Sequence, residues 1–144
     1  MYNQSIEILL VEDDPGDIKL TQKALLKSKL GVGLRVVTKG EEALAFLRRE
    51  GGYTDAPLPD LILLDLNLPG LSGQEVLEEI KSDLNLKLIP VVILTTSNSD
   101  KDILKSYNLG ANCYVRKPVD LHEFMKIVQS IEHFWFTVVK RPWR

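Results

Sequence analysis

Cysteine and long hydrophobic runs are both scarce in this sequence, and each scarcity excludes a class of protein. The single cysteine, Cys113, has no second cysteine with which to form an internal disulfide, which favours a reducing compartment. The apolar run Ile6–Val11 is far shorter than a membrane-spanning helix or a secretory signal. The expected location is therefore the cytoplasm.

An excess of charge of one sign is also lacking. The formal net charge is −2 and the sequence pI is about 5.7, so no global field draws the chain to nucleic acid or to anionic lipid. Lys140, Arg141 and Arg144 are too few to form a convincing basic patch. We expect no direct binding to nucleic acid and none to a membrane.

The composition is that of an ordinary globular domain. The chain has 144 residues, 44% of them hydrophobic and 26% charged, which is enough to bury a core without disulfide or metal support. It contains no internal repeat and no low-complexity tract. A single domain over residues 1–144 is expected, with an extended C-terminal helix and tail from about residue 131.

Short apolar runs alternate with segments of helical spacing. The runs are rich in valine, isoleucine and leucine without polar alternation, which is typical of strands buried on both faces of a parallel sheet. They are Ile6–Val11, Leu34–Val37, Leu61–Leu64, Pro90–Leu94 and Asn112–Val115. The helical segments are Pro15–Leu30, Glu41–Arg49, Gly73–Ser82, Ser99–Leu109 and Asp120–Lys140. This alternation predicts an α/β fold, a (βα)5 three-layer sandwich around a five-stranded parallel sheet.

Polar side chains follow the predicted strands where each strand ends. Glu12 and Asp13 follow the first run, Asp65 the third, Thr95 the fourth and Lys117 the fifth. Ligands of open α/β sheets bind beyond the carboxyl ends of the strands, near a switch in strand order. We therefore expect these side chains to converge on one edge of the sheet.

The chemistry of this set predicts phosphoryl transfer. Three carboxylates, Glu12, Asp13 and Asp65, would repel one another unless a hard cation such as Mg²⁺ lay among them. Lys117 offers a positive charge, and Thr95 a hydroxyl donor, to phosphoryl oxygens. In-line transfer to a carboxylate needs a nucleophile, a metal, a cation and a donor, and it yields an acyl phosphate.

Four segments that carry these residues resemble the signature segments of bacterial response-regulator receiver domains, the CheY-like family. They are Leu10–Asp14, Leu64–Gly70, Leu94–Ser97 and Tyr114–Pro118. The resemblance covers nearly the whole chain in the family's order. It implies a CheY-like, flavodoxin-like fold and a two-component response regulator, phosphorylated by a histidine kinase, that is not an enzyme.

The resemblance also implies a role for each acidic residue. Asp65 would be the phosphoacceptor, carrying a 4-aspartylphosphate. Asp13 would bind the Mg²⁺ directly and Glu12 through water, and Asn67 would supply a backbone carbonyl. Haloacid-type phosphatases need a second aspartate where Asn67 stands, which argues against a turnover enzyme. A degenerate receiver acting as a scaffold would lack Asp65 or Lys117, yet both are present.

Other residues of the resemblance concern the switch. Thr95 would be the switch hydroxyl, Lys117 the phosphate-binding lysine and Tyr114 a rotating aromatic, although a tyrosine that only fills space is an alternative. The Lys117–Pro118 bond is similar to the family's cis peptide, a conformation essentially confined to proline.

Aromatic residues, few elsewhere, gather in the last predicted helix. Phe134, Trp135 and Phe136 are consecutive, so at 100° per residue they span about 200° of the helix and cannot all face one core. We expect a homodimer through this extended fifth helix, the fourth helix and the fifth strand. A longer helix folded back on its own domain is the alternative.

Within the family, the chain is similar to single-domain regulators of cyanobacterial-type phytochrome kinases. The supporting stretches are Val11–Pro15, the insertion Gly51–Asp60 and Ile131–Phe136. The implied partner is a phytochrome histidine kinase, and the implied output is protein–protein contact. Onward transfer of the phosphoryl group to another histidine protein, as a phosphorelay intermediate, is the alternative. The Gly51–Asp60 insertion is expected to be an irregular connector, with contact to a partner as the other possibility.

Overall fold

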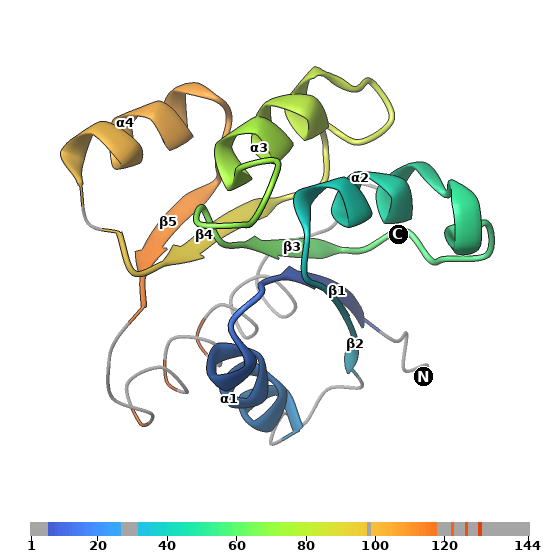
Figure 1. The fold of residues 1–144 in the computed structure, drawn as a ribbon, viewed down its shortest axis with the longest axis horizontal. Helices are drawn as coiled ribbons and strands as arrows, with labels where there is room; N and C mark the ends of the chain where they lie inside the picture. The colour runs from blue at the N-terminus through green and yellow to red at the C-terminus, as the bar shows by residue number, and fades with distance from the viewer. Residues whose placement is uncertain are drawn as a thin grey trace.

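The computed structural model describes residues 6–26, 32–97 and 99–117, together with the single positions 122, 126 and 130. Within these residues the chain forms a five-stranded parallel sheet with the strand order β2-β1-β3-β4-β5 (Figure 1). The strands are β1 (Ile6–Val11), β2 (Val32–Val37), β3 (Leu61–Leu64), β4 (Val91–Thr95) and β5 (Cys113–Arg116). The predicted parallel sheet is confirmed.

Helices cover both faces of this sheet. The helix α1 lies on one face, and α2, α3 and α4 lie on the other (Figure 1). Their bounds are α1 (Pro15–Leu26), α2 (Gly40–Arg48), α3 (Gly73–Ser82) and α4 (Asp100–Asn108). His122, Lys126 and Ser130 are also helical. The rest of the predicted helix Asp120–Lys140 lies outside the described residues.

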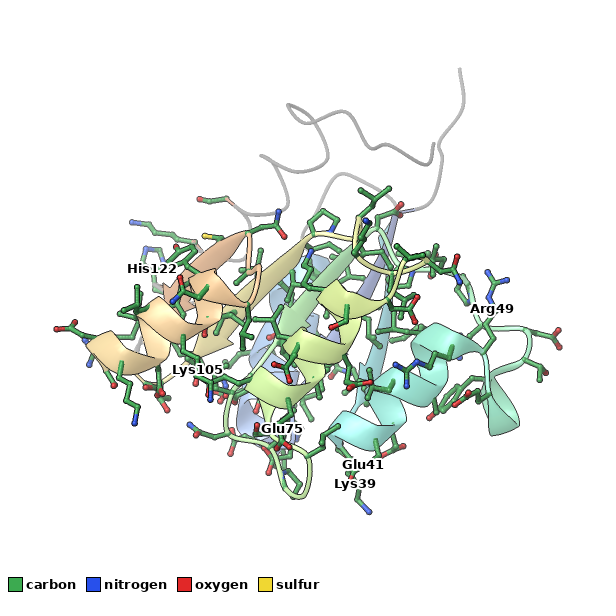
Figure 2. All side chains as sticks on the ribbon, turned by 90° about the horizontal axis from the view of Figure 1, so that it is seen from above. Lys39, Glu41, Arg49, Glu75, Lys105 and His122 are labelled. Atoms are coloured by element: carbon green, nitrogen blue, oxygen red, sulfur yellow. The ribbon has the colours of Figure 1, made fainter. Side chains whose placement is uncertain are left out.

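The helical layer formed by α2, α3 and α4 presents a charged surface. Glu41, Glu75 and Lys105 are exposed on it (Figure 2). In the part of the chain that the structure describes, no helix is both long and apolar enough to cross a bilayer. The layer is apolar where it meets the sheet, and Leu104 and Tyr107 of α4 are exposed beside its charged side chains.

The core explains why the predicted strands show no polar alternation. Every residue of Leu61–Leu64 is at most 2% exposed. Ile62 and Leu64 belong to the apolar cluster under α2 and α3, whereas Leu61 and Leu63 belong to the cluster under α1. Burying one such side chain contributes roughly 1.5–3 kcal/mol. The two clusters together hold the central strands, and hence their carboxyl ends, in place.

The pairing of β1 with β3 positions the first site residues. The strand order changes direction at β1, which pairs with β2 on one side and with β3 on the other. Val11 lies opposite Leu64, and the N–H of Asp65 donates to the carbonyl of Val11 at 3.1 Å. Glu12 and Asp65 therefore leave their strands side by side, at the carboxyl edge where ligands of such sheets bind.

Strand boundaries differ from the prediction by one or two residues. Pro90 and Asn112 lie just before β4 and β5 rather than in them. Proline has no N–H for a ladder, and the Asn112 side-chain oxygen accepts the N–H of Val91 at 2.9 Å. β2 begins at Val32, two residues before the predicted Leu34. Local side-chain bonds at strand ends give no periodic signal in the sequence.

The inserted connector between α2 and β3 is irregular, as predicted, apart from one 3₁₀ turn, η1 (Gly51–Tyr53). Leu58 packs against the core, and the buried carboxylate of Asp60 accepts the N–H of Glu7 at 2.9 Å. The connector is thereby tied to the amino edge of the sheet, opposite the carboxyl edge that carries Asp65.

Candidate functional site

The acidic side chains predicted to converge do so. Glu12 and Asp65 are 2% and 6% exposed, and Asp13 beside them is exposed. One carboxylate oxygen from each of the three lies within 4.8 Å of the others. These carboxylates line a cavity of about 430 Å³ that also contacts Lys117. The site is a small acidic cavity at the carboxyl ends of β1 and β3.

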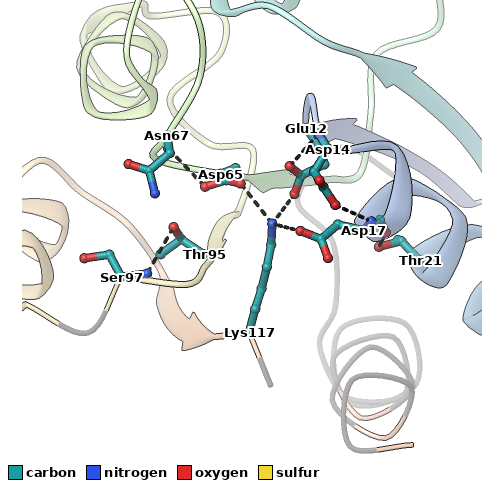
Figure 3. A network of polar contacts seen from close by, with 9 residues as sticks. All are labelled: Glu12, Asp14, Asp17, Thr21, Asp65, Asn67, Thr95, Ser97 and Lys117. Carbon is teal, nitrogen blue, oxygen red and sulfur yellow. Dashed lines mark hydrogen bonds and ion pairs between the residues drawn. The ribbon is translucent and has the colours of Figure 1, made fainter. Parts of the chain in front are cut away.

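Lys117 reaches into this cavity from the end of β5. Its Nζ contacts Oε1 of Glu12, Oδ2 of Asp17 at 2.7 Å and Oδ2 of Asp65 at 2.9 Å (Figure 3). The residue is 6% exposed. A buried ammonium needs paired carboxylates and hydrogen bonds to offset its desolvation, and here three carboxylates supply them.

Asp17 was not anticipated from the sequence. It lies in the first turn of α1, and its N–H donates to Oδ2 of Asp14 at 2.9 Å. Asp14 thus acts as the helix cap, a role for this extra acid that the sequence did not reveal. The first turn of α1 lies at the cavity, where Asp17 accepts a hydrogen bond from Lys117. An aspartate three residues after a capping aspartate was the available signal, and it is a weak one.

The three buried groups influence one another's ionisation. Burial raises the pKa of Glu12 from 4.5 to about 7, against the opposing hydrogen bond from Lys117 and with a further rise from the charge of Asp65. Burial alone would also raise the pKa of Asp65, but the N–H of Asn67 and the Lys117 amine hold it below 3.8. Burial would lower the pKa of Lys117, yet its carboxylate partners raise it above 10.5. Asp65 is therefore an ionised carboxylate beside a cation at neutral pH.

The donor set fits a hard divalent cation. Oxygen ligands from Glu12, Asp13 and Asp65 meet at one place, and three carboxylates are only partly balanced by one lysine. Asn67 lines the same cavity, and its N–H donates to Oδ1 of Asp65 at 3.0 Å. The predicted acidic cluster is thus capable of holding a divalent ion.

The two predicted switch residues lie on neighbouring strands beside the cavity. Thr95 is fully buried at the end of β4, and Thr96 rather than Thr95 lines the cavity. The ring of Tyr114 on β5 is half-buried against the core, and its hydroxyl donates to the carbonyl of Ser97 at 2.8 Å. The N–H of Ser97 donates to Oγ1 of Thr95 at 3.5 Å. Ser97 therefore joins the two.

Two predictions concern residues outside the described part of the chain. One is the cis peptide between Lys117 and Pro118. The other is the dimer surface of Phe134, Trp135 and Phe136. Both stay predictions.

Cys113 is half-buried and packs at the edge of the apolar cluster under α1. Burial raises the pKa of its thiol. An uncharged thiol beside apolar side chains is unreactive, so Cys113 serves as a small packing residue.

A five-stranded parallel sheet with an acidic cavity at the carboxyl ends of its strands is the arrangement of a phosphoryl-accepting α/β domain, and comparison with known families identifies which one. Residues 8–129 match the response regulator receiver domain, and the chain belongs to this family. The predicted family and the CheY-like α/β fold are both confirmed.

Within this family, the chain is similar in sequence and in structure to cyanobacterial response regulators. The chain is 48% identical to response regulator Rcp1 of Synechocystis sp. (strain ATCC 27184 / PCC 6803 / Kazusa), over 94% of this chain and 92% of that protein. Its structure is similar to that of the phosphorylated cyanobacterial phytochrome response regulator RcpA, with a TM-score of 0.94 and 50% identity over 96% of this chain and 99% of that one. The Mn²⁺-bound form of Rcp1 gives a TM-score of 0.91 and 47% identity, over 95% of this chain and 99% of that chain.

Proposed function

We propose that Asp65 accepts a phosphoryl group from the phosphohistidine of a histidine kinase. The observation that carries this proposal is the Asp65 carboxylate, ionised in an acidic cavity with the Lys117 amine 2.9 Å away. A carboxylate oxygen attacks phosphorus, the phosphorus–nitrogen bond breaks, and the electron pair stays on the imidazole, which then takes up a proton. The product is an aspartyl phosphate.

The proposed cation is Mg²⁺, held by Asp13, by Glu12 through water, by Asp65 and by the Asn67 carbonyl. Its chemical contribution is to neutralise charge that accumulates between carboxylates and phosphoryl oxygens. Support comes from the three converging carboxylates and from the Mn²⁺-bound structure of the similar protein Rcp1. Mg²⁺ is proposed over Mn²⁺ because it accepts a few carboxylates while keeping bound waters and taking phosphate oxygens.

The remaining site residues would read the phosphoryl group. Lys117 already contacts Asp65 and would follow the new negative charge to a phosphoryl oxygen. The Thr95 hydroxyl would donate a hydrogen bond to another phosphoryl oxygen. The Tyr114 ring would then favour a different orientation as the loop after β4 changes conformation. Phosphorylation acts by favouring one of two existing conformations.

The proposed partner is a phytochrome-type histidine kinase. Support comes from the similarity to RcpA, which is described as a cyanobacterial phytochrome response regulator. The proposed location is the cytoplasm, and the proposed output is protein–protein contact. The similarity to response regulator Rcp1, over 92% of that protein, supports a regulator of this kind. The chain would not itself turn over a substrate, since Asn67 stands where a second catalytic carboxylate would be needed. Onward transfer to another histidine protein is the alternative output.

The test is incubation with Mg²⁺ and acetyl phosphate followed by intact mass measurement. Wild type should gain one phosphoryl unit, and Asp65→Asn should gain none. Equal labelling of the two proteins would place the acceptor elsewhere. A separate assay compares kinases: transfer from a phytochrome kinase should be far faster than from unrelated histidine kinases, and equal rates would contradict the proposed partner.

A further inference from the structure

Ser97 contacts both residues assigned to the switch, through its backbone. Its N–H donates to Oγ1 of Thr95 at 3.5 Å, the outer limit of a hydrogen bond, and its carbonyl accepts the Tyr114 hydroxyl at 2.8 Å. Ser97 thus lies between the buried hydroxyl at the end of β4 and the ring on β5. Any displacement of Ser97 changes the geometry at both residues.

Asp102 of α4 fixes the remaining polar group of Ser97. The Ser97 hydroxyl donates to Oδ2 of Asp102 at 2.6 Å, a short bond to a charged acceptor, which is the stronger class of hydrogen bond. The other carboxylate oxygen of Asp102 accepts Nε2 of Gln74 at 3.5 Å. One carboxylate therefore joins α4, the first turn of α3 and the loop that follows β4.

This use of Asp102 departs from the usual design of a helix N-terminus. In the complete capping box of α3, Ser72 accepts the N–H of Glu75, and the Glu75 carboxylate accepts the N–H of Ser72 in return. In α4 only the first half is present, because Ser99 accepts the N–H of Asp102 at 3.4 Å.

The second half of the box is diverted to Ser97. The N–H of Ser99 donates to the Ser97 hydroxyl at 3.4 Å, and that hydroxyl donates onward to the Asp102 carboxylate. The carboxylate that would close the helix end instead holds the residue that contacts Thr95 and Tyr114.

We propose that Asp102 is a positioning residue of the phosphoryl switch, acting through Ser97 on Thr95 and Tyr114. Figure 3 shows the Thr95 hydroxyl on the side of Asp65, whereas the Ser97 hydroxyl points away from it. Asp102 thus keeps Thr95 ready to meet a phosphoryl oxygen. Without Asp102, Ser97 and Thr95 would have more conformational freedom to lose when a phosphoryl group binds. Because that loss costs free energy, phosphoryl binding would be weaker. This inference rests on the proposed role of Asp65 as acceptor.

Beryllofluoride, an analogue of the phosphoryl group, tests the inference on the full chain labelled with fluorotyrosine. The ¹⁹F resonance of Tyr114, assigned with Tyr114→Phe, is followed during titration in Mg²⁺. Asp102→Ala and Ser97→Ala should each shift this resonance and raise the beryllofluoride midpoint about fivefold or more, a typical coupling between sites. Ser97→Thr, which keeps the hydroxyl, should behave as wild type.

Asp100→Asn is the matched control, because it removes a carboxylate from the same first turn of α4. Its midpoint should stay within about twofold of wild type, as expected for a loss of helix-dipole interaction alone. The double variant of Ser97→Ala and Asp102→Ala should lose less beryllofluoride affinity than the two single losses added together, because both single variants remove the same bond between Ser97 and Asp102.

Two failures are distinguishable. A wild type that does not respond to beryllofluoride would overturn the proposed acceptor role of Asp65, and this inference with it. A wild type that responds, beside an Asp102→Ala protein with an unchanged midpoint and Tyr114 resonance, would overturn only the role of Asp102. Urea unfolding of each variant identifies loss of fold, and Ser97→Ala, which keeps every charge of α4, carries the test if Asp102→Ala does not fold.

Discussion

At the scale of single residues, the site is organised by the amine of Lys117. It contacts carboxylates that come from the end of β1, the first turn of α1 and the end of β3. These contacts orient Asp65 and balance part of the negative charge of the cavity. A divalent cation bound by Asp13 and its neighbours would balance the same charge, so the amine and the cation oppose each other electrostatically.

Lys117→Ala is therefore expected to bind Mg²⁺ more tightly while accepting phosphoryl groups more slowly. Removing a unit charge a few ångströms from the cation should increase its affinity about tenfold or more at low ionic strength. Calorimetric titration with Mg²⁺ measures the first effect, and phosphoryl uptake from acetyl phosphate measures the second. Lys87→Ala, at an exposed lysine, should change neither. Weaker Mg²⁺ binding by Lys117→Ala would contradict the opposition.

The raised pKa of Glu12 predicts a dependence of stability on pH. Because its pKa rises from 4.5 to about 7 on folding, the folded state holds this proton more tightly, and the resulting stability is lost as pH rises through that window. The lowered pKa of Asp65 acts only below about pH 4, outside this range. The free energy of unfolding is compared in the absence of metal at about pH 5 and about pH 7. Between these values wild type should lose on the order of 1–3 kcal/mol of stability relative to Glu12→Gln.

Urea unfolding in EDTA at the two pH values checks this expectation. Added Mg²⁺ should reduce the difference, because the cation favours the ionised carboxylate. Parallel pH dependence in wild type and Glu12→Gln would show that Glu12 does not titrate in the folded protein as described.

Sequence reasoning located the site residues that directly follow strands. Glu12, Asp65 and Lys117 were predictable because parallel strands end at a common edge. Asp17 was missed because the direction of a helical side chain depends on how α1 is capped and tilted. The bond between Ser97 and Asp102 was missed for a related reason: a cap motif in the sequence does not say which donor its carboxylate will accept a hydrogen bond from.

At the scale of elements, the strands were the most predictable part of the fold and their ends the least. Continuous apolar runs identified β3 and β4 because both faces of these strands are buried. The contact of α3 with the loop after β3 could not be predicted. Gly73 begins α3 against the backbone of Asp65, where an added Cβ would lie 2.1 Å from the Asp65 carbonyl oxygen.

Gly73→Ala should therefore displace the start of α3 from the phosphoacceptor. We expect a loss of stability of about 1–3 kcal/mol, the usual effect of overpacking, and slower phosphoryl uptake. Gly52→Ala is the matched control, because a Cβ there meets no atom within 4 Å. Urea unfolding and intact mass measure the two effects. Equal stability of the two variants would mean that α3 does not pack on Asp65 as described.

At the scale of the whole molecule, the chain is proposed to work as a switch that assembles with other proteins. The family and fold are established by the receiver-domain match and by the similarity to RcpA. Assembly is a prediction from composition, since Phe134, Trp135 and Phe136 cannot all face one core. The partner that would bury these side chains could not be predicted from the sequence, because burial of apolar surface is non-directional and does not specify what packs against it.

The predicted homodimer is checked by sedimentation, with and without beryllofluoride and Mg²⁺. Wild type should sediment as a dimer at high micromolar concentration, and Trp135→Glu should shift the equilibrium to monomer. A wild-type monomer in both conditions would defeat the proposed dimer and favour the helix folded back on its own domain.

The central claim is that the phosphoryl group resides on the carboxylate of Asp65. Borohydride reduction of the phosphorylated protein converts an aspartyl phosphate to homoserine, and peptide mass mapping then locates the altered residue. The account predicts homoserine at position 65 and at no other aspartate, and only after treatment with Mg²⁺ and phosphoryl donor. Homoserine at Asp13 or Asp17, or phosphate found on a histidine, would contradict it.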